Sequence, residues 1–304
     1  MSDLFELLAQ VEPERGPWIL VTMVAAEGST YRTPGAHLLL NAEGYSGMLS
    51  GGCLEAEVMA RCQPLLQGKV PFLAMEIDTR RLLGCHGQIG LVAETLPPDL
   101  VNVVTEAREQ RQKRTLYTSM PGPGWLPTSI TPRDNAFEHD LEPSLRLLVF
   151  GSGPGVPPLL RMAEVLGWES KQLVLAGDPA VPLRPQADWT VLPSAVSVAR
   201  QVDERTVCIV MNHHVGRDTE TLLALWNTST PFLGMLGSRR RRDEILERIA
   251  WSVDLDSRVL HAPVGIELGA EGAAAIALEI CAQIQREVAG AGSARQDLRS
   301  SLAV

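Results

Sequence analysis

The chain has 304 residues, of which 45% are hydrophobic and 21% are charged. This apolar share is enough to build hydrophobic cores, so it excludes a mainly disordered chain, and the length favours two domains. The 27 basic and 36 acidic residues give a net charge of −9. That charge argues against a general nucleic-acid-binding protein, because phosphate contacts need a basic surface.

The cysteine content and the first residues indicate a cytoplasmic protein. The chain has 5 cysteines and no Cys-x-x-Cys pair, which argues against a structural zinc or iron–sulfur site. The acidic start is unlike a secretory signal, and the apolar run at 18–26 is shorter than the roughly 20 residues of a membrane helix. We therefore expect reduced thiols and no membrane partner.

The first part of the chain has the mixed periodicities of an α+β domain. Apolar spacing predicts helices over 2–10, 54–67 and 99–113. Runs rich in β-branched and apolar residues predict strands over 18–25, 36–40, 45–49, 71–77, 88–94 and near Leu116.

A segment rich in proline and glycine follows from residue 121 and predicts a linker over 121–143. The domains are therefore expected at 1–120, an α+β domain, and at 144–289. Residues 290–304 are expected to form a mobile tail.

After Pro143 the pattern alternates between short apolar runs and helical segments. Strands are predicted at 145–150, 173–176, 189–192, 207–211 and 232–236. Helices are predicted up to 166 and at 194–201, 218–227, 239–251 and 271–289. Such alternation favours a doubly wound parallel sheet, so we expect a Rossmann-like α/β domain.

A glycine loop opens this second domain. Gly151, Gly153 and Gly155 follow a predicted strand and precede a helix, where backbone N–H groups could bind a phosphate. Val156 replaces the last glycine of the dinucleotide fingerprint, and Asp178, a candidate ribose ligand, lies further along than the usual distance of about 20 residues. Two interpretations stay open, a site for NAD(P) or another nucleotide and a Rossmann-like loop that binds none.

Two cysteines lie in glycine-rich loops of the first domain. Cys53 follows Gly51 and Gly52 at the start of a predicted helix, and Cys85 follows Gly84. A thiol at a helix N-terminus can have a lowered pKa and act as a nucleophile, soft-metal ligand or sulfur carrier. The alternative for Cys53 is a buried structural cysteine. The other three cysteines lie on apolar faces and are expected in the core: Cys62, Cys208 and Cys281.

Polar residues also follow the last strands of the second domain, where ligands of open parallel sheets bind. His213 follows the strand at 207–211, and Asp218 is expected to cap the next helix. Ser238 is expected to cap the helix that begins at Arg239. Arginines in a first turn oppose the helix dipole, so Arg239 and Arg240 indicate either an anion bound at this helix start or a solvated face.

Together these motifs resemble the XdhC/CoxI family of accessory factors for xanthine dehydrogenase and related molybdenum hydroxylases. The resemblance covers nearly the whole chain and rests on motifs in both domains. The motifs lie at 28–36, 50–55, 83–85, 149–153, 211–213, 236–240 and 261–266.

The resemblance implies a chaperone that binds molybdenum cofactor, protects it, supports its sulfuration with a cysteine desulfurase and inserts it into an apo-hydroxylase. It implies a non-catalytic maturation factor, a homodimer, and molybdopterin or its cytidine dinucleotide form as the cofactor. Cys53 and Cys85 are the candidate contacts to molybdenum or sulfur. The cofactor-binding positions that it implies are Arg32, Gly51, Gly52, Cys53, Gly84, Cys85, Gly151, Gly153, Asp178, His213, Ser238, Arg239 and Arg240.

The chain departs from the family pattern at four positions near the presumed ligand face, namely His86, Pro154, His214 and Ala275. An alternative function is an NAD(P)-dependent oxidoreductase that uses the glycine loop and Asp178. The sequence lacks an obvious Tyr-x-x-x-Lys arrangement for that chemistry, and Lys171 is the only lysine of the second domain.

Overall fold

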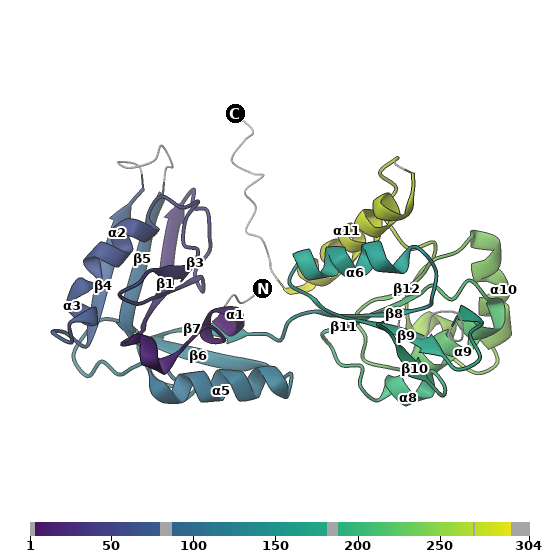
Figure 1. Ribbon diagram of the computed structural model, residues 1–304, viewed down its shortest axis with the longest axis horizontal. Coiled ribbons are helices and arrows are strands. Elements are labelled where there is room, and N and C mark those ends of the chain that lie inside the picture. The colour runs from purple at the N-terminus through teal and green to yellow at the C-terminus, as the bar shows by residue number, and fades with distance from the viewer. Residues whose placement is uncertain (1–3, 80–86, 181–187, 270, 293–304) are drawn as a thin grey trace. The chain divides into compact units, whose positions relative to one another are not determined.

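The computed structural model describes residues 4–79, 87–180, 188–269 and 271–292. The chain divides into two compact units, Met1–Pro143 and Ser144–Val304. The expected fold classes are confirmed, because the first unit has an antiparallel sheet with helices and the second has a parallel sheet (Figure 1).

The first unit contains a five-stranded sheet with the order β3-β2-β1-β5-β4. Its strands are antiparallel where they pair, and β1 lies at the centre. The strands are β1 Ile19–Gly28, β2 His37–Leu40, β3 Tyr45–Gly47, β4 Phe72–Asp78 and β5 Gly87–Thr95. The helices are α1 Leu4–Leu8, α2 Glu55–Arg61, α3 Gln63–Leu66 and α5 Pro98–Glu109.

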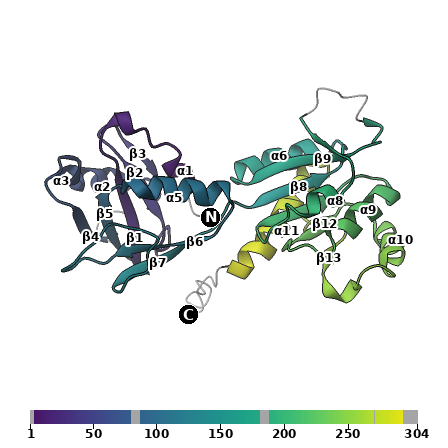
Figure 2. The same ribbon diagram turned by 90° about the horizontal axis from the view of Figure 1, so that it is seen from below.

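Both faces of this sheet are buried, because successive side chains of a strand point to opposite faces. Ile19, Val21 and Met23 of β1 pack with residues of α2 and α3. Leu20 packs in a second cluster with residues of α1 and α5, which lie side by side (Figure 2). The strand expected at 18–25 is therefore the buried centre of the sheet.

The helix expected at 54–67 is two short helices, α2 and α3, which meet at Cys62. Pro64 has no N–H for the helix ladder, and in one continuous helix its ring would collide with the carbonyl four residues earlier. The helix expected at 99–113 ends at Glu109, because Arg111 takes a left-handed conformation with φ 52°.

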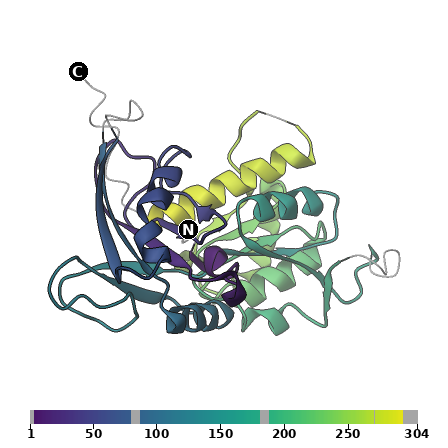
Figure 3. The same cartoon turned by 60° about the vertical axis from the view of Figure 1, so that its left-hand side comes forward.

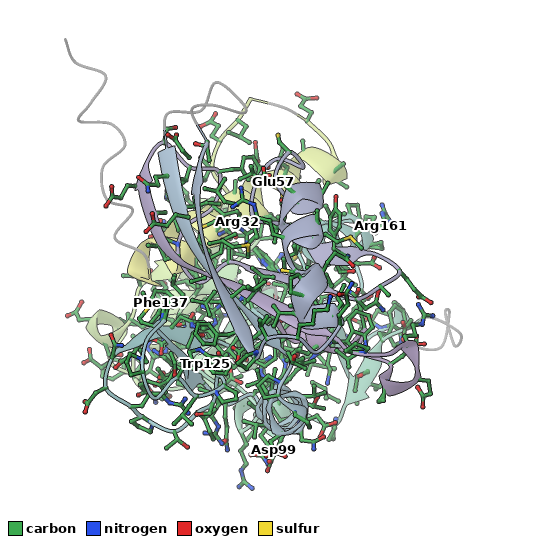
Figure 4. The ribbon with its side chains drawn as sticks, turned by 90° about the vertical axis from the view of Figure 1, so that its left-hand side faces the viewer. Arg32, Glu57, Asp99, Trp125, Phe137 and Arg161 are labelled. Atoms are coloured by element: carbon green, nitrogen blue, oxygen red, sulfur yellow. The ribbon has the colours of Figure 1, made fainter. Side chains whose placement is uncertain are left out.

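The expected linker at 121–143 contains a strand. Strand β7 (Ala136–Leu141) pairs in antiparallel fashion with β6 (Arg114–Ser119). Trp125 stacks on Phe72 with ring centroids 4.6 Å apart, and both Trp125 and Phe137 are labelled in Figure 4. This segment therefore packs against the five-stranded sheet and belongs to the first unit, which ends at Pro143.

A buried histidine and a half-buried histidine join β7 to the five-stranded sheet. The Nε2 atoms of His37 on β2 and His139 on β7 lie 3.0 Å apart. Burial lowers the pKa of His37 well below its usual value, and the positive Arg32 adds to this effect. Burial also lowers the pKa of His139 to about 4, although Asp140 opposes the shift. Both imidazoles are therefore neutral at pH 7, and one ring donates to the other.

This pair should make the first unit sensitive to acid. Between pH 6.5 and 5, His139 is protonated in the unfolded chain but neutral in the folded chain. The free energy of unfolding therefore decreases by roughly 2 kcal/mol as the pH falls through this range. The variant H37L/H139F should lose this part of the pH dependence in denaturant unfolding. Equal slopes in the wild type and in this variant would contradict the assignment.

The second unit contains a parallel sheet with the order β10-β9-β8-β11-β12-β13. Numbered from β8, this order is 3-2-1-4-5-6, the order of a dinucleotide-binding Rossmann sheet. The strands are β8 Arg146–Phe150, β9 Glu169–Leu175, β10 Thr190–Leu192, β11 Thr206–Val210, β12 Leu233–Met235 and β13 Leu260–His261.

Helices cover both faces of the parallel sheet. The helices are α6 Val156–Val165, α8 Val196–Ala199, α9 Val215–Leu225, α10 Arg239–Ile249 and α11 Ala273–Gly292. Leu147 and Val149 of β8 pack under α6 and α11, which run side by side over one face (Figure 3). Leu148 and Phe150 point to the opposite face, which α8, α9 and α10 cover.

Three details of the second unit differ from the sequence expectations. The two-residue strand β13 was not expected, since so short a run has no detectable alternation. His214, not Asp218, caps α9, and its Nδ1 atom accepts a hydrogen bond from the N–H of Arg217. Helix α11 continues to Gly292, beyond the expected start of a tail at 290, and residues 293–304 lie outside the described residues.

The three cysteines expected in the core are buried there. Cys62 packs in the first unit, and Cys208 and Cys281 pack on opposite faces of the parallel sheet. Burial raises the pKa of Cys62 and Cys281 to about 11. These thiols are therefore protonated and screened from reagents.

Candidate functional site

In the first unit, a buried carboxylate fixes the loop that carries Cys53. Oε1 of Glu55 accepts hydrogen bonds from the N–H groups of Leu49 and Ser50, at 2.9 and 2.7 Å. Oε2 accepts from Oγ of Ser50 and from N–H of Leu54, at 2.7 and 3.1 Å. Burial alone would raise the pKa of Glu55, but the hydrogen bonds from Ser50 and Leu49 lower it overall. The charged carboxylate thus holds the loop at both ends.

Cys53 lies exposed at the tip of this loop. Its N–H donates to Oγ of Ser50 at 3.0 Å, and the preceding Gly52 has φ 97°, a conformation that glycine adopts without strain. Helix α2 begins at Glu55, two residues later than Cys53, and has seven residues. The sequence had suggested that the thiol lies at the start of a helix. In the structure it lies instead on a fixed loop before the helix.

The loop after β1 lies next to the Cys53 loop. A Cβ atom at Gly51 would lie 4.0 Å from the ring of Tyr31, which is 68% exposed. Arg32 follows in the same loop and is labelled in Figure 4. Oγ1 of Thr30 donates to the carbonyl of Arg32 at 2.9 Å, which fixes the loop locally. The structure thus brings Arg32, Gly51 and Cys53 to one end of the first unit.

The segment with Gly84 and Cys85 lies outside the described residues, but both of its ends are described. Oγ1 of Thr79 donates to the carbonyl of Gly87 at 2.7 Å and accepts from its N–H at 3.1 Å. A Cβ atom at Gly87 would lie 2.5 Å from the carbonyl oxygen of Ser29 and 2.9 Å from Thr30. Gly87, which pairs with Thr79, therefore lies beside the loop that carries Tyr31 and Arg32.

In the second unit, the glycine loop lies at the carboxyl ends of β8 and β11. Gly151 has φ 148°, and a Cβ atom there would lie 2.3 Å from the carbonyl oxygen of Met211. A Cβ atom at Gly155 would lie 3.1 Å from the methyl group of the same methionine. Gly151 is therefore required by the close packing of two strand ends, irrespective of any ligand, whereas Gly155 faces only the end of the flexible Met211 side chain.

Asp178 follows β9 and is only 3% exposed. Its carboxylate accepts from Oγ of Ser152 at 3.2 Å and from the N–H of Ala180 at 2.8 Å. Arg217, which donates to the carbonyl of Gly177, places a guanidinium nitrogen 4.0 Å from Oδ2 of Asp178. The candidate ribose ligand is thus already partnered by the protein.

A second buried carboxylate, Asp218 at 0% exposure, links α9, α10 and β11. Its Oδ1 atom accepts from N–H and Nδ2 of Asn212 at 3.2 and 3.1 Å. Its Oδ2 atom forms an ion pair with Arg241. Burial raises the pKa of Asp218, although the Arg241 guanidinium and the Asn212 hydrogen bonds oppose the shift. This network fixes the first turn of α10 beside the end of β11.

Ser238 caps α10 as expected, because its Oγ atom accepts from the N–H of Arg241 at 3.3 Å. Arg239 and Arg240 are exposed in the first turn. Their neighbours Arg241 and Arg242 instead pair with Asp218 and Asp243. The two exposed guanidinium groups at the start of α10 could therefore contact an anion at the carboxyl edge of the sheet.

No three His, Cys, Asp or Glu side chains of the described ranges gather in a group that could hold a metal ion. None of the helices described has both the length and the apolar character needed to cross a bilayer.

Two family models match this chain. The model described as "XdhC and CoxI family" matches residues 13–75, which include the Tyr31 and Cys53 loops, and the "XdhC Rossmann domain" model matches residues 147–284. The chain belongs to the XdhC/CoxI family. Together the matches cover the loops that carry Arg32, Cys53 and His213, whereas Gly84 and Cys85 lie between the two matched ranges.

Relatives of known name are similar to this chain over most of its length. It is 27% identical to a Bacillus subtilis protein named as a probable xanthine dehydrogenase subunit, over 93% of this chain and 97% of that one. It is 26% identical to "Molybdenum cofactor insertion chaperone PaoD" of Escherichia coli, over 88% and 82%. A crystal structure named as a xanthine dehydrogenase of Bacillus halodurans shares the fold, with TM-score 0.77, 24% identity and 99% of each chain covered.

Sequence reasoning missed two residues that shape the first site. Glu55 entered the sequence analysis only as part of the motif at 50–55, but its carboxylate builds the loop. Tyr31 was noted only as part of a motif, but it is exposed beside Gly51. The sequence offered two signals for these residues. Glu55 is an acidic residue just after a Gly-Gly-Cys turn, and Tyr31 is a tyrosine in a polar loop.

Proposed function

We propose that this XdhC/CoxI protein is a molybdenum cofactor insertion chaperone for a xanthine dehydrogenase-like molybdenum hydroxylase. It binds the cofactor as cargo, shields it, supports its sulfuration with sulfur from a cysteine desulfurase and delivers it to the apoenzyme. We expect it to act in the cytoplasm, as a homodimer, and to be a maturation factor, not an enzyme.

The observation that carries the proposal is an exposed thiol on a preformed loop in the family-matched part of the chain. A thiolate is a soft ligand that suits molybdenum and sulfur chemistry. Glu55 holds the loop before any ligand arrives, so little conformational entropy is lost on binding. Arg32 next to this loop supplies a positive charge for an anionic cargo. Gly84 and Cys85 are proposed to extend the same site.

In the second unit, we propose that Arg239 and Arg240 bind a phosphate group. A bound phosphate would offset the unfavourable placement of two positive charges at a helix N-terminus. Ser238 and the Asp218–Arg241 ion pair hold that turn in place. Gly151, Gly153, Asp178 and His213 lie at the same carboxyl edge, after β8, β9 and β11.

Cofactor retention tests the proposal. The chain is co-expressed with a complete cofactor pathway, and bound molybdopterin is released and measured as its fluorescent oxidised pterin. C53A should retain about tenfold less pterin, as expected for the loss of one contact worth about 1.4 kcal/mol. C85A should behave similarly, and C62A, which removes a buried thiol, should retain the wild-type amount. A wild-type protein that carries no pterin would refute the chaperone function.

The alternative of an NAD(P)-dependent oxidoreductase has less support. Asp178 is held by Ser152 and Ala180, and Lys171 lies within strand β9, away from the carboxyl edge. Turnover of any substrate with NADH or NADPH by the purified protein would favour it.

A further inference from the structure

The side chain of His213 occupies the open side of the glycine loop. A Cβ atom at Gly153 would lie 3.1 Å from Cδ2 and 3.2 Å from Nε2 of the His213 imidazole. In dinucleotide-binding Rossmann sheets this second glycine lacks a side chain so that the backbone can approach the pyrophosphate. Here the space above Gly153 is filled by a protein ring.

The backbone of His213 is held in an unusual conformation. Its φ is 54°, in the left-handed region that few residues other than glycine adopt. The conformation follows from its position between Asn212, which is fixed to Asp218, and His214, which caps α9. The residues on both sides therefore aim the imidazole over the loop, and the ring remains exposed.

The rest of the loop also lacks features that a pyrophosphate needs. Pro157 and Pro158 lie in the first turn of α6 and have no N–H to donate. Gly151 makes room for the backbone of Met211 at the end of the neighbouring strand. Ser152 donates its hydroxyl hydrogen bond to Asp178.

We infer that His213 is a specificity-determining residue, which excludes the pyrophosphate of a dinucleotide from the glycine loop. This inference deepens the proposed function, on which its second part rests: the cargo is the cofactor form with a single phosphate ester and not the cytidine dinucleotide form. The imidazole leaves room for one phosphate at Arg239 and Arg240. It prevents a second phosphate from binding at the glycine loop.

Removal of the ring should open the loop to a dinucleotide. H213G deletes the imidazole and adopts φ 54° without strain, and H213N keeps a residue type that tolerates this conformation. NADH serves as the probe, because its fluorescence reports binding directly. Both variants should bind NADH at least about tenfold more tightly than the wild type. H214N is the matched control, since it removes a neighbouring exposed imidazole but keeps a good helix cap, and it should bind NADH as weakly as the wild type.

The inference fails if the wild type binds NADH as tightly as H213G, or if neither folded variant binds NADH more tightly than the wild type. Thermal melting of each protein establishes that it is folded. The cargo part is tested on pterin-loaded wild-type protein from cells that also make the cytidine dinucleotide form. Acid hydrolysis should release pterin without equimolar CMP, and equimolar CMP would overturn it. A wild type without any pterin would instead refute the chaperone function, while the NADH comparison would still judge His213.

Discussion

Replacing Asp218 with alanine should lower the free energy of unfolding of the second unit by about 3 kcal/mol, because removal of one partner leaves a buried charge unpaired. The substitution leaves the Arg241 guanidinium without its ion pair and Asn212 without the acceptor for two hydrogen bonds. Urea unfolding followed by tryptophan fluorescence measures the loss, since Trp226 in the same core becomes exposed.

D243A is the control for Asp218. Asp243 pairs with Arg242 at the surface of the same helix, and exposed ion pairs contribute only about 0–1 kcal/mol. An effect of D218A as small as that of D243A would show that the buried network contributes little. D218A should also weaken the retention of cofactor, because the first turn of α10 loses its attachment to β11.

Replacing Glu55 with alanine should destabilise the first unit by about 3 kcal/mol and reduce pterin retention about tenfold. A hydrogen bond to a charged group contributes roughly 1.5–3 kcal/mol, and several bonds to one group do not add fully. Glu55 accepts from Leu49, Ser50 and Leu54. E55Q keeps the shape but replaces one acceptor oxygen with a donor, so we expect an intermediate loss in both measurements.

Glu57, which is labelled on α2 in Figure 4, provides the comparison for Glu55. Its carboxylate pairs with Arg61, and both side chains are partly exposed. E57A should change the unfolding free energy by less than about 1 kcal/mol and should leave pterin retention unchanged. Stable E55A protein with full retention would show that the loop needs no support. The stabilisation by Glu55 should disappear as the pH falls below 4.5, since its pKa is lowered in the folded chain.

The sequence was sufficient to predict both sheets, because strand alternation and helical spacing report burial directly. It failed where charged residues interrupt a pattern. Strand β7 has Phe137, His139 and Leu141 on one face, but Glu138 and Asp140 between them gave it the composition of a linker. Short elements such as β13 were missed because two residues carry no periodicity.

The sequence indicated which loops to consider for the candidate site, but it did not indicate the contacts within them. Glycines and cysteines in loops indicated where the chain could bind a ligand. The sequence does not show which polar groups already have a partner, because the partners are distant in sequence. Asp178 accepts a hydrogen bond from Ser152, and Asp218 forms an ion pair with Arg241. The same limit explains why Asp218 was expected to cap a helix that His214 caps.

The packing of Gly151 and Gly155 against Met211 has a consequence for how such chains are recognised in genomes. A pattern search that scores these glycines detects the close packing of two strand ends. The chain needs this packing whether or not it binds a nucleotide. Whether the loop can bind a nucleotide depends instead on the residue that lies against the second glycine, which is His213 in this chain. A search that also recorded the residue after the fourth strand could separate Rossmann sheets that use coenzymes from those that keep only the architecture.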